Sequence, residues 1–166
     1  ALEAMANRSG RVPLISRKRL DDLAATRPVV EGEALRRAMP RITADDIEVL
    51  SALTDQYDDA LAASDGTPGS AAADLNHAFH ERLYATAWSE VLMPIIESLW
   101  LQSGPYVRAA ADIYREVGGL PATHHHRALL SAIAAGDGAA AQSALAADID
   151  FAFALLRERL PSGATP

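Results

Sequence analysis

The sequence has no cysteine and few aromatic residues, and both shortages narrow the classes of protein to which it can belong. Without cysteine, neither a disulfide framework nor a thiolate metal site is available. Aromatic residues make up 5% of the chain, whereas apolar residues, with alanine prominent among them, make up 49%. Small apolar side chains suit closely packed helices better than a sheet, so we predict an all-α fold.

Two further absences concern the membrane and secretion. No apolar run approaches the roughly 20 residues that a helix needs to span a bilayer, and the opening ALEAMANRSG lacks the pattern of a signal peptide. The length of 166 residues suits one domain. We therefore expect a soluble, cytoplasmic, single-domain protein without a membrane partner.

Acidic residues are missing from residues 4–20, which carry five basic residues. The rest of the chain has ten basic and 22 acidic residues, and the whole has a net charge of -7. The acidic body should repel nucleic acid, so only the N-terminal strip is suited to contact a phosphate backbone.

Hydrophobic periodicity and helix breakers predict six or seven helices, and their short connections predict an antiparallel bundle. Ser16 precedes the first helix, in which Pro28 predicts a kink or restart near Arg27. Thr43, with Asp46 three residues later, predicts the cap of the second helix. The predicted helices cover residues 17–39, 43–64, 71–87, 89–102, 105–117, 123–135 and 138–160, with the clearest loop at DGTPGS, residues 65–70.

The five histidines fall into two clusters, at residues 77–80 and 124–126. His80 shares a face of its helix with Asn76, Leu83 and Ala87, at the core seam or its edge. Successive helical residues are turned by about 100°, so only one residue of the second cluster, His126, lies on the inward stripe.

Asp148 falls between Leu145 and Ala152, where the apolar stripe of the last helix predicts an apolar residue. A buried carboxylate needs a cation or hydrogen-bond donors. Together with Asn76, His80 and His126, this carboxylate would form a two-nitrogen, two-oxygen site for zinc, manganese, iron or nickel. The simpler alternatives are hydrogen-bonded core histidines and a salt bridge from Asp148 to an arginine. The remaining three histidines, His77, His124 and His125, are predicted at the surface or supporting a ligand.

Four short motifs occur in a fixed order along the chain. They are Arg27 with Glu31 (R-x-x-x-E), the Phe79-His80 pair four residues after Asn76, the run His126-Arg-Ala-Leu-Leu-Ser-Ala-Ile, and the step Gly136-Asp137 into the last helix. From about Leu20 to Leu160, the chain thereby resembles the ligand-binding domain of GntR-type bacterial transcription regulators, in the FCD subgroup.

The resemblance implies a metal held by an aspartate and three histidines. The matching positions here are Asn76, His80, His126 and Asp148, so asparagine replaces the aspartate and aspartate replaces the last histidine. The resemblance also implies a cavity for a small organic acid, whose carboxylate the ion polarises.

Arg27 is the candidate positive group for binding this effector, with an ion pair to Glu31 as an equally weighted alternative. Three large aromatic residues are candidates either for the pocket wall or for the core: Trp88, Trp100 and Tyr106.

ALEAMA and NRSGRVPLIS resemble pieces of a winged helix-turn-helix. We therefore expect residues 1–16 to be a remnant of that domain and its linker, residues 17–160 to form the effector-binding and dimerisation domain, and residues 161–166 to be a tail. The DNA-binding domain itself would lie mostly outside this chain. The predicted protein is a metabolite-responsive regulator that binds operator DNA as a homodimer.

Two other functions are compatible with the residues. A helical metal-dependent hydrolase or oxygenase would use the same ligands, but no general base stands out beside them and no G-x-S-x-G motif is present. A dimerisation module without a ligand would close the histidine region by packing.

Overall fold

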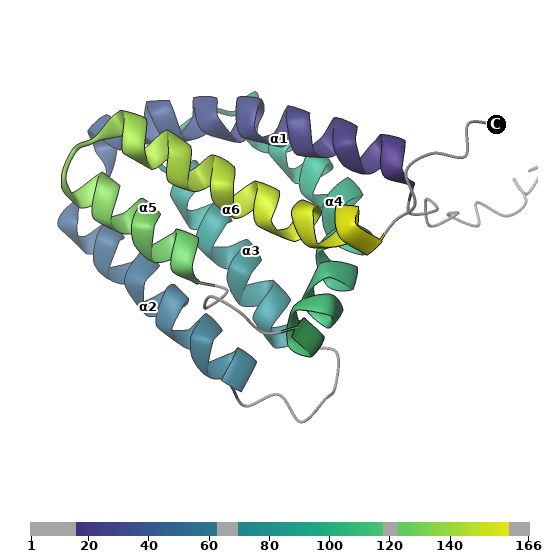
Figure 1. Ribbon diagram of the computed structural model, residues 1–166. Coiled ribbons are helices and arrows are strands. Elements are labelled where there is room, and N and C mark those ends of the chain that lie inside the picture. Colours follow the sequence, from purple (N-terminus) through teal and green to yellow (C-terminus); the bar gives the residue numbers. More distant parts are fainter. Residues whose placement is uncertain (1–15, 63–69, 118–122, 160–166) are drawn as a thin grey trace, which may run out of the picture.

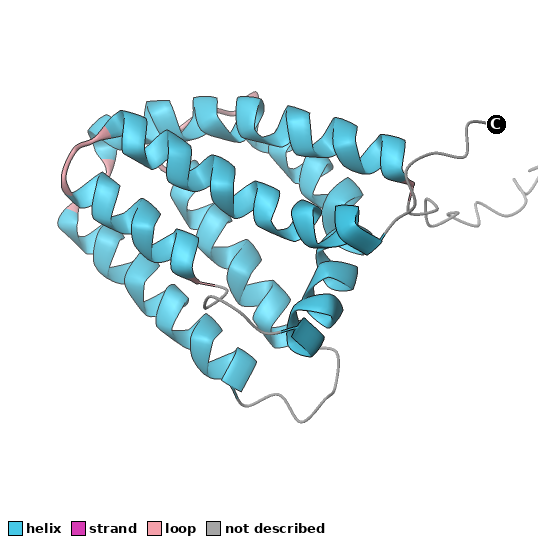
Figure 2. Cartoon of the chain, in the orientation of Figure 1, coloured by secondary structure: helices cyan, strands magenta, loops and turns pink. Residues whose placement is uncertain are grey.

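A computed structural model describes residues 16–62, 70–117 and 123–159, and the regular structure in these ranges is entirely helical (Figures 1 and 2). This confirms the predicted all-α fold. The described helices are α1 (Arg17–Ala38), the short 3-10 helix η1 (Met39–Arg41), α2 (Ala44–Ala62), α3 (Ser70–Ala85), α4 (Leu92–Val117), α5 (His124–Ala134) and α6 (Gly138–Arg159).

Two helix starts follow directly from the capping residues in the sequence. The Ser16 hydroxyl accepts a hydrogen bond from the Arg19 amide at 3.3 Å. Thr43 and Asp46 bond reciprocally: the Asp46 amide donates to Thr43 Oγ1 at 3.2 Å, and the Thr43 amide donates to Asp46 Oδ2 at 3.0 Å. Each cap satisfies amides that a helix start leaves without partners, which is typically worth about 1 kcal/mol.

Two predicted helix breaks are absent. Helix α1 runs without interruption through Pro28. The helices predicted at 89–102 and 105–117 form the single helix α4, which begins at Leu92 and contains Pro105. An interior proline costs about 3 kcal/mol, whereas each fully buried leucine contributes roughly 2 kcal/mol. Packing on both sides of the prolines therefore outweighs the lost hydrogen bonds, and the described bundle has six α-helices, not seven.

Some predictions lie outside the described residues. They concern the winged-helix remnant up to residue 15, most of the DGTPGS loop and the C-terminal tail.

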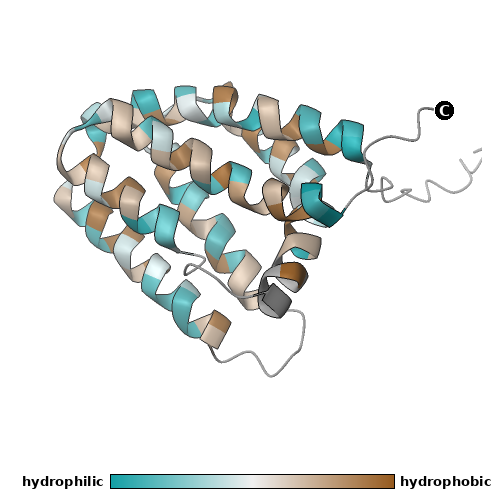
Figure 3. Cartoon of the chain, in the orientation of Figure 1, coloured by the Kyte–Doolittle hydropathy of each residue, from teal (hydrophilic) through white to brown (hydrophobic). Residues whose placement is uncertain are grey.

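Helix α6 lies between α1 and α5 (Figure 1) and also packs against α4, while α2 packs against α3 and α5. Helices α1 and α6 are antiparallel, because Gln142 Nε2 donates to the Gly32 carbonyl at 2.7 Å near one end and Arg157 bonds Asp21 near the other. In the view of Figure 3, apolar and polar residues alternate along the visible sides of the helices. The largest completely buried side chains are Phe79, Tyr84, Tyr106 and Phe153.

Helix α6 is apolar enough, with a mean hydropathy of 1.4, and long enough to qualify as a membrane span. This differs from the expectation that no apolar run is long enough to span a bilayer. In the bundle, Leu145, Ile149 and Phe153 of α6 are buried against neighbouring helices. One face of α6 therefore belongs to the core.

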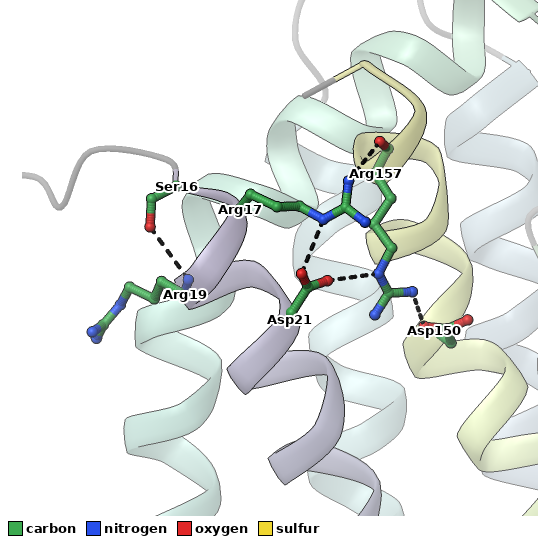
Figure 4. Close-up of polar contacts among 6 residues, drawn as sticks. All are labelled: Ser16, Arg17, Arg19, Asp21, Asp150 and Arg157. Carbon is green, nitrogen blue, oxygen red and sulfur yellow. Dashed lines mark hydrogen bonds and ion pairs between the residues drawn. The ribbon is translucent and has the colours of Figure 1, made fainter. Parts of the chain in front are cut away.

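Ion pairs tie the start of α1 to the end of α6 (Figure 4). Asp21 accepts hydrogen bonds from Arg17 Nε at 3.0 Å and from Arg157 Nε at 2.9 Å. Arg157 also donates to Asp150 at 2.6 Å. The hydrogen bond from Arg157 is the main reason why the pKa of Asp21 lies below its ordinary value of 3.8.

Replacing Asp21 by asparagine should lower the free energy of unfolding at pH 7 by roughly 0.5–1 kcal/mol, since these half-exposed pairs are screened by solvent. A carboxyl with a lowered pKa stabilises the fold above its unfolded pKa, and this contribution is lost as the pH falls through the folded pKa. The difference between Asp21→Asn and the wild type should therefore shrink below pH 3.8. Urea unfolding at several pH values measures it, with the exposed neighbour Asp22→Asn as control. A pH-independent difference would contradict the ion-pair explanation.

Candidate metal centre

Three polar side chains from three helices meet inside the bundle: His80 from α3, His126 from α5 and Asp148 from α6. Their potential ligand atoms all lie within 4.8 Å of one another. His80 Nε2 is 3.0 Å from Asp148 Oδ2, and His126 Nε2 is 3.6 Å from Asp148 Oδ1. The histidines are 1% and 0% exposed, and the Asp148 side chain is 12% exposed. Asp148 is therefore the least buried side chain of the cluster.

Ring packing fixes both imidazoles. The Phe79 ring stacks on His126 at a centroid distance of 3.9 Å and an interplanar angle of 7°, and it meets His80 edge-on at 5.2 Å. The other three histidines point elsewhere: His77 and His124 are exposed, and His125 is half-buried. The helical period thus predicted correctly which histidine of each cluster faces inward.

His126 has no hydrogen-bond partner on either ring nitrogen within the described part of the chain. Burial lowers its pKa to about 4, so at neutral pH the imidazole is uncharged and carries a free lone pair. Burial by itself raises the pKa of Asp148, but His126 and His80 more than offset this and keep it below its ordinary value of 3.8. The cluster at pH 7 therefore combines a carboxylate with a buried nitrogen acceptor that lacks a donor.

These residues fit a divalent metal ion. Zinc binds imidazole nitrogens and carboxylate oxygens at about 2.0–2.2 Å, which places neighbouring ligand atoms roughly 3.3 Å apart, close to the distances found here. An ion would also satisfy the unpartnered nitrogen of His126, a group that is otherwise costly to bury. Asn76 lies one turn before His80 on α3 and is half-buried. Its role as a fourth ligand stays a prediction.

A buried hydrogen-bond chain leads away from the cluster. His80 Nδ1 is 3.1 Å from the Tyr84 hydroxyl, which donates to Glu31 Oε2 at 2.7 Å. Trp100 Nε1 donates to the same oxygen at 3.2 Å. The hydrogen bonds of Tyr84 with His80 and Glu31 were not predicted, although the four-residue spacing from His80 places both residues on one helix face.

Arg27 forms the ion pair that was predicted as the alternative to effector binding. Its guanidinium is 3% exposed and donates to Glu31 Oε1 at 2.6 Å and Oε2 at 3.2 Å. It also lies 4.4 Å from the centre of the Trp100 ring, a cation–π distance. A direct contact between Arg27 and an effector stays a prediction.

The two other candidate pocket aromatics lie elsewhere. Trp88 is 80% exposed, and Tyr106 is a core residue with 1% exposure.

A surface groove of about 760 Å³ runs between α1 and the start of α6, away from the cluster. Gly32, Glu33, Arg36 and Gln142 are among its lining residues, and none of the residues that line it belongs to the cluster. The buried nitrogens without a hydrogen-bond partner lie in the cluster and not in the groove. The cluster is therefore the candidate functional site.

Comparison with known proteins identifies a matching family and solved structures with a similar fold. The FCD domain family matches residues 22–151. The solved structure of E. coli McbR/YncC superposes with a TM-score of 0.76 at 22% identity, over 89% of this chain and 72% of that chain. A transcriptional regulator described as a GntR family member, from Pseudomonas syringae pv. tomato, gives a TM-score of 0.67 at 23% identity, over 86% of this chain and 56% of that one. No curated protein matches the chain.

Replacing His126 by leucine tests whether this side chain is a metal ligand. In metal-free protein the variant should be at least as stable as the wild type, because removing an unsatisfied buried polar group gains about 1–3 kcal/mol and losing the ring stack costs about 0.5–1.5 kcal/mol. Added zinc should raise the melting temperature of the wild type and leave His126→Leu unchanged. Thermal unfolding with and without zinc measures this, with the exposed His124→Leu as control. A strongly destabilised metal-free His126→Leu would contradict the prediction.

Proposed function

This chain belongs to the FCD domain family of the GntR-type regulators, and from that membership we propose that it is the sensor part of a metabolite-responsive transcription regulator. In this proposal His80, His126 and Asp148 hold a divalent transition metal, with Asn76 as a fourth, weaker ligand. The ion binds the carboxylate of a small organic acid. The regulator acts in the cytoplasm and binds operator DNA through a domain of which residues 1–16 are a remnant.

The observation that carries the proposal is the lone pair of His126, buried without a donor beside an ionised carboxylate. Two histidines and one carboxylate leave coordination positions open on a divalent ion, and an organic acid supplies the oxygen ligands that fill them. Asp148 is the least buried of the three side chains, so we expect such a ligand to enter beside it.

The site favours a sensor over the two alternative functions. The family consists of transcription regulators and not of enzymes, so a metal-dependent hydrolase or oxygenase is set aside. A dimerisation module without a ligand would have no use for the unsatisfied nitrogen of His126, which is costly to bury.

A homodimer is part of the proposal, because two operator half-sites require a two-fold partner. The described residues leave several large apolar side chains exposed on α4 and just before it, which supports an interface there. They are Trp88, Val91, Ile95 and Leu101.

Purified protein should contain about one transition metal ion per chain after incubation with zinc, measured by elemental analysis after gel filtration. His80→Ala and Asp148→Ala should lose the ion, because each removes one of three ligands. His77→Ala, an exposed histidine on the same helix, is the matched control and should keep it. A metal-free wild type, or equal metal content in all variants, would contradict the proposed centre.

Small di- and tricarboxylic acids should stabilise the zinc-loaded protein and leave the metal-free protein unaffected. A ligand at 100 times its dissociation constant adds about 2.7 kcal/mol to the free energy of unfolding, which a thermal shift detects. The corresponding amides serve as controls, since they lack the charge that the ion attracts. Equal shifts with and without zinc would contradict an effector bound through the ion.

A further inference from the structure

A continuous chain of buried polar contacts joins the metal centre to α1. It runs from Asp148 Oδ2 to His80 Nε2 at 3.0 Å, from His80 Nδ1 to the Tyr84 hydroxyl at 3.1 Å, and from that hydroxyl to Glu31 Oε2 at 2.7 Å. His80, Tyr84 and Glu31 are each 1% exposed or less. Because these groups are buried, the few protons in this chain determine the direction of every hydrogen bond.

The Glu31 end of the chain is an acceptor. Arg27 is always protonated and donates to both carboxylate oxygens, and the indole of Trp100 is only a donor. Glu31 therefore receives hydrogen bonds from all sides, and the hydroxyl of Tyr84 must donate to it.

Tyr84 has a single hydroxyl proton, and Glu31 takes it. A phenol ordinarily titrates at about pH 10, so at neutral pH the Tyr84 hydroxyl keeps that proton. Toward His80, the Tyr84 oxygen can only accept. The proton of this contact therefore resides on His80 Nδ1.

In its uncharged form, with the proton on Nδ1, His80 turns a bare nitrogen lone pair toward Asp148 Oδ2, only 3.0 Å away. Two acceptors at this distance repel unless a positive species lies beside them. We propose that Tyr84, oriented by Glu31, is a positioning residue that keeps the proton of His80 on Nδ1 and thereby presents Nε2 as a metal ligand. The inference rests on the proposed metal centre and adds how its ligand is oriented.

Metal-ligating histidines generally donate their second N–H to an oxygen, and removing that oxygen lowers metal affinity about 10–100-fold. Tyr84→Phe keeps the buried ring and deletes only the oxygen. The variant should bind zinc about 10–100-fold more weakly in a chelator competition. Tyr106→Phe is the matched control, since Tyr106 is equally buried and its hydroxyl accepts a hydrogen bond from the Ser16 amide at 3.3 Å, away from the metal centre.

Nitrogen NMR of ¹⁵N-histidine-labelled, metal-free protein reads the proton position directly, which a purely structural role of Tyr84 would not move. Wild-type His80 should carry a proton on Nδ1, and Tyr84→Phe should shift it to Nε2, where Asp148 accepts it. A wild-type His80 protonated on Nε2 alone overturns the proposal. So does a loss of zinc affinity in Tyr84→Phe with the proton still on Nδ1, because packing would then explain the loss.

The proposed metal centre and the proposed role of Tyr84 can be contradicted separately. A wild type that binds no zinc contradicts the metal centre itself. Zinc affinity in Tyr84→Phe equal to that of the wild type and of Tyr106→Phe contradicts only the role of Tyr84.

Discussion

The carboxylate of Glu31 has no exposed surface, and the compensation of its charge determines how the helices around the metal centre meet. An unpaired buried charge costs several kcal/mol, so donors must surround it. Arg27 supplies two from the preceding turn of α1, Tyr84 supplies one from α3, and Trp100 supplies one from α4. Apolar burial is non-directional, whereas these hydrogen bonds are satisfied in only one register. They therefore fix α1, α3 and α4 relative to one another more sharply than core packing alone.

The two histidines of the proposed centre are held by different interactions. This difference decides which of them would contribute more to the free energy of metal binding. His80 is hydrogen-bonded on one nitrogen and lies against Asp148 with the other. His126 is fixed by its stack on Phe79 and has neither nitrogen satisfied among the described residues. An ion bound as proposed would replace existing contacts at His80 and Asp148, whereas at His126 it would supply a polar partner that the described residues lack. Because burial without a partner is the larger penalty, much of the gain in free energy on binding would come from His126.

The sequence predicted what is local and left open what depends on long-range contacts. The caps at Ser16 and Thr43 are decided within four residues, and the inward faces of His80 and His126 follow from the helical period. The unbroken α1 and α4 were not predicted, because the penalty of Pro28 and Pro105 is local while the packing that outweighs it is not. Likewise, the ion pair of Arg27 with Glu31 within α1 was one of two equally weighted alternatives, but the donors to Glu31 from α3 and α4 are separated from it by 53 and 69 positions. Such partners are defined only by the folded register of the bundle.

The position of Glu31 on α1 bears on how a sensor of this kind transmits its state. A ligand shifts the equilibrium between two placements of α1 only if its affinities for the two placements differ. A placement of α1 that withdraws Glu31 from Tyr84 leaves a buried hydroxyl unpaired, at a cost of about 1–3 kcal/mol, and releases the orientation of His80. In the proposed sensor, an ion and its effector would therefore bind more tightly to the placement in which this contact is intact. The start of α1 is held by half-exposed ion pairs of Asp21 and Arg157, which are weaker. Moving α1 therefore costs the least free energy at its N-terminal end, which adjoins the basic segment. It costs the most at Glu31, where the hydrogen bond from Tyr84 links α1 to the candidate metal centre.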